Sequence, residues 1–229
     1  MMFWLALPLT LLCFFSFRKL YQLFPFPLFN PVLLSLLSLI ALLVILDIPY
    51  TDYATGSAPL SWLLEPAVVA LALPLYQQAQ QIRKQLKPIF IACTIGVTSS
   101  LLIVIPLAWV MGADQSVIAS LAPQSVTTPV AMGITQSLGG IPALTAAVVI
   151  IVGIVGAAFG LPFLNRIGVK DDASQGLAMG AAAHALGTAR AIEHSEQHGA
   201  YSSLALILCA VLMAFLAPLI FAFYMLFLP

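Results

Sequence analysis

The densest group of polar side chains within an apolar stretch of this sequence is PQSVTTP, at positions 123–129. Pro129 has a fixed φ angle that suits the first turn of a helix, and it keeps the preceding residue out of the α region. We therefore expect a helix break at Pro129, with Thr127 or Thr128 as the helix cap and Ser125 nearby. A helix N-terminus offers free N–H groups and partial positive charge, so the motif predicts a site for a small anion. The alternative is a capped loop that binds nothing.

A second polar group lies in 176–191, a stretch rich in alanine and glycine with one histidine. Gly180, His184 and Thr188 are spaced by four and share one helix face. An imidazole in an apolar segment can bind a carboxylate substrate or carry a coupled proton near neutral pH. It can equally form a structural hydrogen bond between helices. We therefore count His184 as a candidate for substrate binding and for ion coupling.

Gly187, Thr188 and Arg190 complete the substrate-binding candidates in this stretch. For the glycines the alternative is close helix packing, because small residues let two helices approach. Arg190 lies off the face of His184. It either pairs with Glu193 or His194 at the end of the segment or reaches an anionic substrate.

An acidic residue, Glu65, stands directly before Pro66 in the apolar run LLEPAVV. An ionisable group in such a run is a functional candidate, here for proton or cation coupling. The alternative is an interfacial helix cap, since a carboxylate followed by proline suits a helix start. Pro74 removes a further helical N–H and frees a carbonyl for a ligand, or it only kinks the helix.

Catalytic and metal-binding patterns are missing from the sequence. It contains no nucleophile triad, nucleotide-binding loop or metal-ligand spacing. An intramembrane enzyme would need a nucleophile and a base, for which only Ser125 and His184 from different segments are available. We therefore expect no enzyme, no metal and no cofactor beyond a coupled proton or sodium ion. The three cysteines all lie in apolar runs and are interpreted as small buried hydrophobes.

The composition places these groups in a membrane protein. Of 229 residues, 62% are hydrophobic and 7% are charged, whereas soluble domains carry roughly 25% charged residues. The formal net charge is zero, which gives no reason to expect a nucleic-acid partner. The first apolar run is followed by Arg18 and Lys19 and not by a cleavage site, so we interpret it as a retained span rather than a signal peptide.

Eight apolar stretches organise the chain, and a membrane helix needs about 20 residues. Continuous stretches predict spans at roughly 3–24, 31–49, 88–111, 142–165 and 200–228. Stretches interrupted by proline, glycine and polar residues lie at 62–84, 115–139 and 174–196. We expect an all-α polytopic protein with about six to eight transmembrane or re-entrant segments, because backbone polar groups in lipid must be satisfied within the segment.

The layout of these stretches repeats after about 112 residues, a pattern typical of secondary transporters. It predicts two membrane repeats, 1–112 and 113–229, in inverted orientation and with broken helices. Orientation follows from basic clusters, which favour the cytoplasmic side. They place the acidic 47–59 loop outside and make 115–139 a re-entrant or hairpin element that begins and ends outside.

Four stretches of the sequence are specific enough to compare with known families: LLEPAVVALALPLYQQAQQIRKQ, PQSVTTPVAMGITQSLGGIPALTA, GLAMGAAAHALGTARA and GAYSSLALILCAVL. They resemble the LrgB/CidB family of bacterial membrane proteins. The resemblance covers almost the whole chain and implies a multi-pass protein of the bacterial inner (cytoplasmic) membrane. It implies two functions: holin- or antiholin-like control of murein hydrolases with a small LrgA/CidA-type membrane partner, or transport of small carboxylates such as pyruvate, glycolate or glycerate.

The candidate residues favour transport, because a helix N-terminus, hydroxyls, an imidazole and a guanidinium suit a carboxylate, whereas a membrane lesion requires none of them. We therefore expect a carrier of small monocarboxylates such as pyruvate, glycolate or lactate. It would work by alternating access, elevator-like in a homodimer, with or without ion coupling. The alternative is the holin- or antiholin-like regulator of murein hydrolase activity and autolysis.

Overall fold

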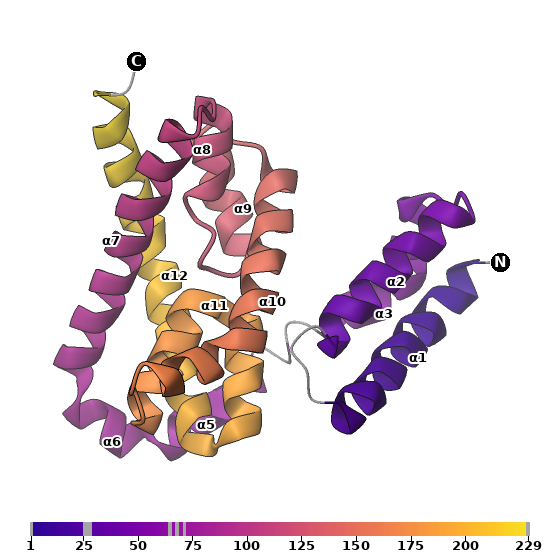
Figure 1. The fold of residues 1–229 in the computed structure, drawn as a ribbon, viewed down its shortest axis with the longest axis horizontal. Coiled ribbons are helices and arrows are strands. Elements are labelled where there is room, and N and C mark those ends of the chain that lie inside the picture. Colours follow the sequence, from indigo (N-terminus) through magenta and orange to yellow (C-terminus); the bar gives the residue numbers. More distant parts are fainter. Residues whose placement is uncertain (1, 25–28, 64–65, 67–68, 71, 228–229) are drawn as a thin grey trace. The chain divides into compact units, whose positions relative to one another are not determined.

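The computed structural model describes residues 2–24, 29–63, 66, 69–70 and 72–227, which contain helices and no strand. The chain forms two compact units, 1–72 and 73–229. The ribbon in Figure 1 shows the helices of each unit. Glu65, one of the two ion-coupling candidates, lies outside the described residues. Pro66 is helical and exposed, and Pro74 lies in α5 (Ala72–Gln77).

The first unit contains α1 (Met2–Leu23), α2 (Pro31–Ile45) and α3 (Tyr50–Trp62), with both later helices packed on α1. The carboxamide oxygen of Asn30 accepts hydrogen bonds from the N–H groups of Val32 and Leu33, and Pro31 occupies the first turn of α2. The hydroxyls of Thr10 and Tyr53 are 2.7 Å apart and join α1 to α3. The prediction of a loop at 47–59 is wrong, because most of this stretch belongs to the polar helix α3.

The second unit is built on three helices that are long and apolar enough to cross a bilayer. They are α7 (Leu86–Val110), α10 (Pro142–Arg166) and α12 (Glu196–Met225). The short helix α6 (Ala79–Lys84) precedes α7. Membrane-spanning length follows from about 1.5 Å of rise per helical residue. This agrees with the expected all-α membrane protein.

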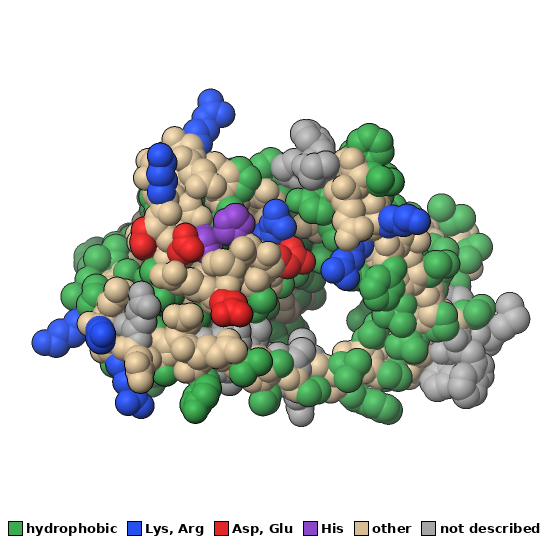
Figure 2. Space-filling model, turned by 90° about the horizontal axis from the view of Figure 1, so that it is seen from below, with side chains coloured by type: hydrophobic (Ala, Val, Ile, Leu, Met, Phe, Trp, Pro, Cys, Tyr) green, Lys and Arg blue, Asp and Glu red, His purple; other side chains and the backbone are tan. Residues whose placement is uncertain are grey.

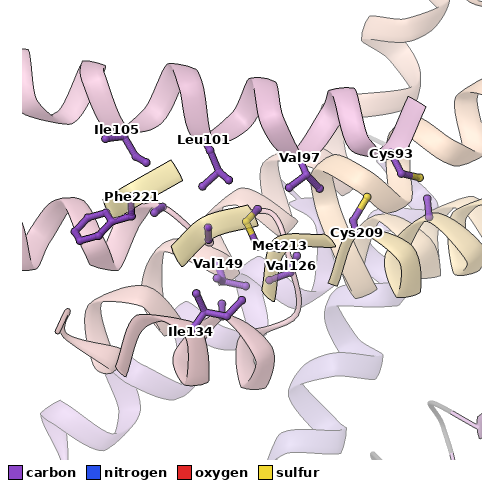
Figure 3. Packing of buried hydrophobic residues seen from close by; sticks show 14 of the residues in the cluster. Cys93, Val97, Leu101, Ile105, Val126, Ile134, Val149, Cys209, Met213 and Phe221 are labelled. Carbon is purple, nitrogen blue, oxygen red and sulfur yellow. The ribbon is translucent and has the colours of Figure 1, made fainter. Parts of the chain in front are cut away.

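The helices α7 and α12 pack side by side and run parallel. Gln85 and Tyr201, 116 positions apart, share a hydrogen bond of 3.1 Å. Figure 3 shows two pairs with this same spacing in the sequence, further along the two helices: Cys93 lies beside Cys209, and Ile105 lies near Phe221. Buried residues recur every fourth position in both helices, which is the spacing that lets two helix surfaces interlock. The predicted repeat matches the stretch of α7 with that of α12, and an inverted repeat requires such a pair to run in opposite directions. These two helices run parallel, so they do not support the inverted repeat, which stays a prediction.

Between α7 and α10 the chain forms α8 (Gln115–Leu121) and α9 (Thr128–Ser137). The hydroxyl oxygen of Ser120 accepts a hydrogen bond from the N–H of Ile141 at 2.7 Å, so the chain returns close to the point it left. The sequence predicts a re-entrant or hairpin element over 115–139, and the structure has a hairpin at 121–139, after α8, which we call the re-entrant loop (Figure 1). That the element begins and ends outside the membrane stays a prediction. Its buried Val126 joins the core beside Met213 and Val149 (Figure 3).

The helix α11 (Asp172–His194) packs against α12 and α10. Its backbone leaves the helical region at His184, where φ is 41° and ψ is −132°, and we call this point the α11 break. A Cβ on Gly187 would lie 2.5 Å from the carbonyl oxygen of Met179, so the two halves of α11 fold against each other. A Cβ on Gly180 would collide with the carbonyl of Ser202, so that glycine is required for the contact with α12.

Candidate functional site

A cleft of about 590 Å³ lies within the second unit. Its walls come from α7, the re-entrant loop, α10 and the first half of α11, up to Ala181 and Ala182 just before the α11 break. Small residues dominate these walls, which leaves the space open. The polar side chains that line it are Ser99, Ser100, Gln124, Ser125 and Ser174.

Ser125 is the notable polar group of the cleft. Its side chain is 7% exposed, and its hydroxyl has no hydrogen-bond partner among the described residues. Most buried hydroxyls in proteins are hydrogen-bonded, because an unpaired one costs about 1–3 kcal/mol. A polar group left unpaired in a cleft wall is therefore the feature expected of a binding site that awaits a ligand.

α9 begins at Thr128, three residues beyond Ser125. Thr127 is the N-cap residue, with an extended backbone, but its side chain makes no capping hydrogen bond. The predicted helix start at Pro129 is therefore present, with Thr127, one of the two predicted caps, at the N-cap position but without a side-chain capping bond among the described residues. The N–H groups of this first turn keep the partial positive charge that attracts anions. Thr127 and Thr128 are half-buried and lie beside the cleft wall in sequence, not in the wall itself.

His184 lies outside the lining of the cleft, at the α11 break. Its Nε2 is 2.9 Å from the carbonyl oxygen of Val149, to which it donates, so it joins α11 to α10. The ring packs so closely on α10 that a Cβ on Gly153 would lie 2.5 Å from its Cε1 atom. This is the structural hydrogen bond that the sequence left open as one alternative.

Thr188 and Arg190 also have partners within the protein. The Thr188 hydroxyl donates to the carbonyl oxygen of His184 at 2.8 Å and lies 2.9 Å from the Ser202 hydroxyl. The guanidinium of Arg190 pairs with Glu193 at 3.0 Å on an exposed surface. Among the seven substrate-binding candidates, the structure therefore places only Ser125 in the cleft. Gly187 serves the packing of α11 on itself.

The α7 wall of the cleft was not predicted. Gly96, Ser99 and Ser100 lie in a stretch that was interpreted as an ordinary span. The sequence signal was present as GVTSS within an apolar helix, because serine pairs are rare where lipid is the solvent. Gln124, adjacent to Ser125, was within the predicted motif but was not singled out.

Residues 10–223 match the model of the LrgB-like family. The chain belongs to the LrgB-like family. Over 84% of both chains, this LrgB-like protein is 42% identical to an uncharacterized protein of Haemophilus influenzae. It is 34% identical to the holin-like protein CidB of Staphylococcus epidermidis over 96% of each chain. It is 36% identical to the antiholin-like protein LrgB of Bacillus cereus over 86% of each. No solved structure matches it.

Proposed function

We propose that the protein is a carrier of small monocarboxylates of the pyruvate, glycolate and lactate type, located as a multi-pass protein in the bacterial inner membrane. The observation that supports this best is Ser125, whose buried hydroxyl has no partner among the residues that the structure describes. It lies in the wall of the cleft, close to the start of α9. A carboxylate can accept hydrogen bonds from that hydroxyl and from the first N–H groups of α9.

The size and polarity of the cleft are consistent with a small singly charged acid. The volume of about 590 Å³ is ample for a three-carbon acid with several water molecules. Among the described residues, its lining holds hydroxyls and one carboxamide but no charged side chain. A substrate with several charges would meet too little compensation there, because burying an unpaired charge is costly.

Carrier action requires elements that can move beside the substrate. The re-entrant loop and the α11 break interrupt regular helices at the cleft, as broken helices do in secondary transporters. Alternating access would shift these elements relative to α7 and α12. An elevator-like movement in a homodimer, inverted repeats, and coupling to protons or sodium through Glu65 or His184 are parts of this proposal.

A second candidate function is holin- or antiholin-like control of murein hydrolases with a small LrgA/CidA-type membrane partner. It is favoured by the names of two relatives, the holin-like CidB and the antiholin-like LrgB. These names support regulation more directly than they support transport. In this reading, the effect depends on the partner and not on the chemistry of the cleft.

The test is uptake of labelled pyruvate, glycolate or lactate into liposomes that contain the purified protein alone. Saturable uptake is expected, and Ser125→Ala should reduce it about tenfold, since a hydrogen bond to a charged group contributes about 1.5–3 kcal/mol. Thr128→Val and His184→Ala should also lower uptake, by disturbing the start of α9 and the link to α10.

Ser203→Ala is the matched control, because Ser203 is another buried serine without a partner among the described residues and lies outside the lining of the cleft. It should leave uptake unchanged. Leakage that does not depend on the substrate and is the same in all variants would reject the carrier. The regulator would be supported by autolysis that changes in cells only when the small partner is co-expressed.

A further inference from the structure

His198, near the start of α12, is a second buried imidazole and has no role in the cleft lining. It is 2% exposed, and both ring nitrogens have hydrogen-bond partners. Nε2 lies 2.9 Å from Oε1 of Gln175 in α11, and Nδ1 lies 2.8 Å from the hydroxyl of Ser195. A ring that is fully bonded on both sides has a defined protonation pattern.

The carboxamide of Gln175 fixes which nitrogen of His198 carries hydrogen. Its Nε2 donates to the carbonyl oxygen of Val169 at 2.6 Å and to Oδ1 of Asn165 at 2.8 Å. Since a carbonyl oxygen only accepts, the amide nitrogen must face Val169, and the amide oxygen Oε1 faces His198. That oxygen can only accept as well, so Nε2 of His198 is protonated in every state. Nδ1 is therefore the atom that gains or loses a proton.

The surroundings of Nδ1 accommodate both protonation states. The Ser195 hydroxyl can donate to a neutral Nδ1 or accept from a protonated one. A carboxylate oxygen of Asp172 lies 3.6 Å from Nδ1 and stabilises the charged ring. Asp171 acts in the same direction, and its own pKa is held below the usual carboxyl range by the N–H and the hydroxyl of Ser174.

Two factors oppose the charged ring, and burial of the ring is the larger. The neighbouring imidazole of His194 is the second. His194, from the other end of α11, has its ring 4.6 Å from that of His198, and a positive charge there would repel the protonated form. Figure 2, which views the structure from below, shows acidic side chains gathered beside histidine on this face. Burial and the imidazole of His194 therefore oppose protonation of the ring, and two carboxylates favour it.

This site and the cleft share the first turns of α11. Ser174, which is bonded to Asp171, lines the cleft, and its neighbour Gln175 holds His198. A Cβ on Gly176 would lie 2.6 Å from the carbonyl oxygen of His198, so α11 and α12 touch here through backbone. His198 and the cleft wall at Ser174 are therefore connected through Asp172 and Gln175, which lie in the same turn of α11.

We propose that His198 is a proton-binding site that controls access to the cleft. When Nδ1 gains a proton, the ring attracts the Asp172 carboxylate and draws the start of α11 against α12, which restricts movement of the wall at Ser174 and Ala178. When the proton leaves, that attraction is lost and the wall loosens. For transport, the consequence is inhibition by acid at this end of the protein, and this part rests on the proposed function. The proton site itself does not depend on that function.

The test is the labelling rate of Ala178→Cys, a residue of the cleft wall, in full-length protein whose native cysteines are replaced by alanine. A maleimide reagent is applied between about pH 5 and pH 8, the range in which histidine changes its charge. The rates are divided by those of Met111→Cys, an exposed residue beyond α7, to remove the intrinsic pH dependence of thiols. The relative rate should fall about threefold or more as the pH is lowered through the histidine range.

Variants assign the effect to one imidazole. His198→Gln should abolish the pH dependence, and the exposed His194→Gln should retain it. Asp172→Asn is the milder variant if His198→Gln fails to fold. It should move the midpoint of the profile to lower pH by about half a unit, because removal of a nearby carboxylate disfavours the charged ring.

A flat profile in the parent, an unchanged midpoint in Asp172→Asn, or a dependence that disappears in His184→Gln while persisting in His198→Gln would overturn the proposal. The labelling needs no substrate and no transport. If uptake into liposomes fails but labelling behaves as expected, the carrier function is wrong and the proton site stands. If uptake succeeds but labelling is independent of pH, the proton site is wrong and the carrier function stands.

Discussion

The Nε2 atom of His184 lies 2.9 Å from the carbonyl oxygen of Val149, and this bond connects the α11 break to the middle of α10. A residue with φ of 41° and ψ of −132° is strained unless it is glycine, and such strain costs about 1–3 kcal/mol. The bond to Val149, together with that from Thr188 to the His184 carbonyl, holds the strained residue in place. Ala181 and Ala182, in the cleft wall, are positioned by the same arrangement.

Gly153→Ala should therefore destabilise the protein. The new methyl would lie 2.5 Å from Cε1 and 2.7 Å from Nε2 of His184, and the ring cannot retreat without breaking its bond to Val149. Overpacking of this kind costs about 1–3 kcal/mol. The measurement is the free energy of unfolding in detergent, followed by circular dichroism.

The control for this substitution is Gly133→Ala in α9, where a Cβ would meet no atom within 4 Å. It should leave the free energy of unfolding unchanged or raise it by up to about 1 kcal/mol, because alanine favours a helix over glycine. Equal stabilities of the two variants would contradict the close contact between Gly153 and His184.

The start of α11 should lose protection in acid. Two hydrogen bonds to the Asp171 carboxylate hold its pKa below the usual carboxyl range. The one from the N–H of Ser174 contributes most, and the one from the Ser174 hydroxyl contributes less. A carboxyl with a depressed pKa in the folded state stabilises that state above the ordinary carboxyl pKa of about 4 and loses this contribution as the pH falls through the depressed value. Amide exchange at Ser174 and Gln175, corrected for intrinsic rates, should therefore accelerate only in that acidic range.

Asp171→Ala should make the same amides exchange about fivefold faster near neutral pH, since loss of an N-cap costs about 1 kcal/mol, and should remove the acid dependence. Asp114→Ala is the matched control, because Asp114 caps α8 in the same manner. It should alter exchange in α8 and leave α11 unchanged. Exchange at the start of α11 that is equally fast in both variants would refute the capping role.

The features that proline and turn residues mark could be predicted from the sequence, and those that depend on packing could not. PQSVTTP predicted the start of α9, because proline acts on its own backbone and on the preceding residue. The hairpin was predicted separately, from the distribution of basic residues along the chain. The α11 break falls at His184, a residue with no local tendency to break a helix. The break is accompanied by contacts with distant residues: His184 bonds Val149 in α10, and Gly187 packs on Met179 in the other half of α11.

The cleft shows the same division. Ser125 was predicted because its neighbours are polar, whereas Ser99 and Ser100 lie in an apolar helix where a serine can bond its own backbone, as Ser99 does to Gly96. The sequence left two roles open for Arg190, an ion pair at the end of its segment or a contact with an anionic substrate. The structure places it at an exposed helix end, where it pairs with Glu193. Residue type indicates what a side chain can bind, and tertiary structure decides which partner is within reach.

Thr145→Val should loosen the re-entrant loop. The Thr145 hydroxyl donates to the carbonyl oxygen of Ser120 at 3.0 Å and lies 2.8 Å from the Thr135 hydroxyl, all in a buried position. Valine keeps the shape but leaves two buried polar groups without this partner, at a cost of about 1–3 kcal/mol. The free energy of unfolding in detergent should fall by that amount, and amides of α9 should exchange faster.

Thr94→Val provides the comparison, since the Thr94 hydroxyl donates to the carbonyl of Phe90 in its own helix. This substitution should change the free energy of unfolding by less than about 0.5 kcal/mol. If Thr145→Val were no more destabilising than Thr94→Val, the hydroxyl cluster would not be what holds the re-entrant loop against α10.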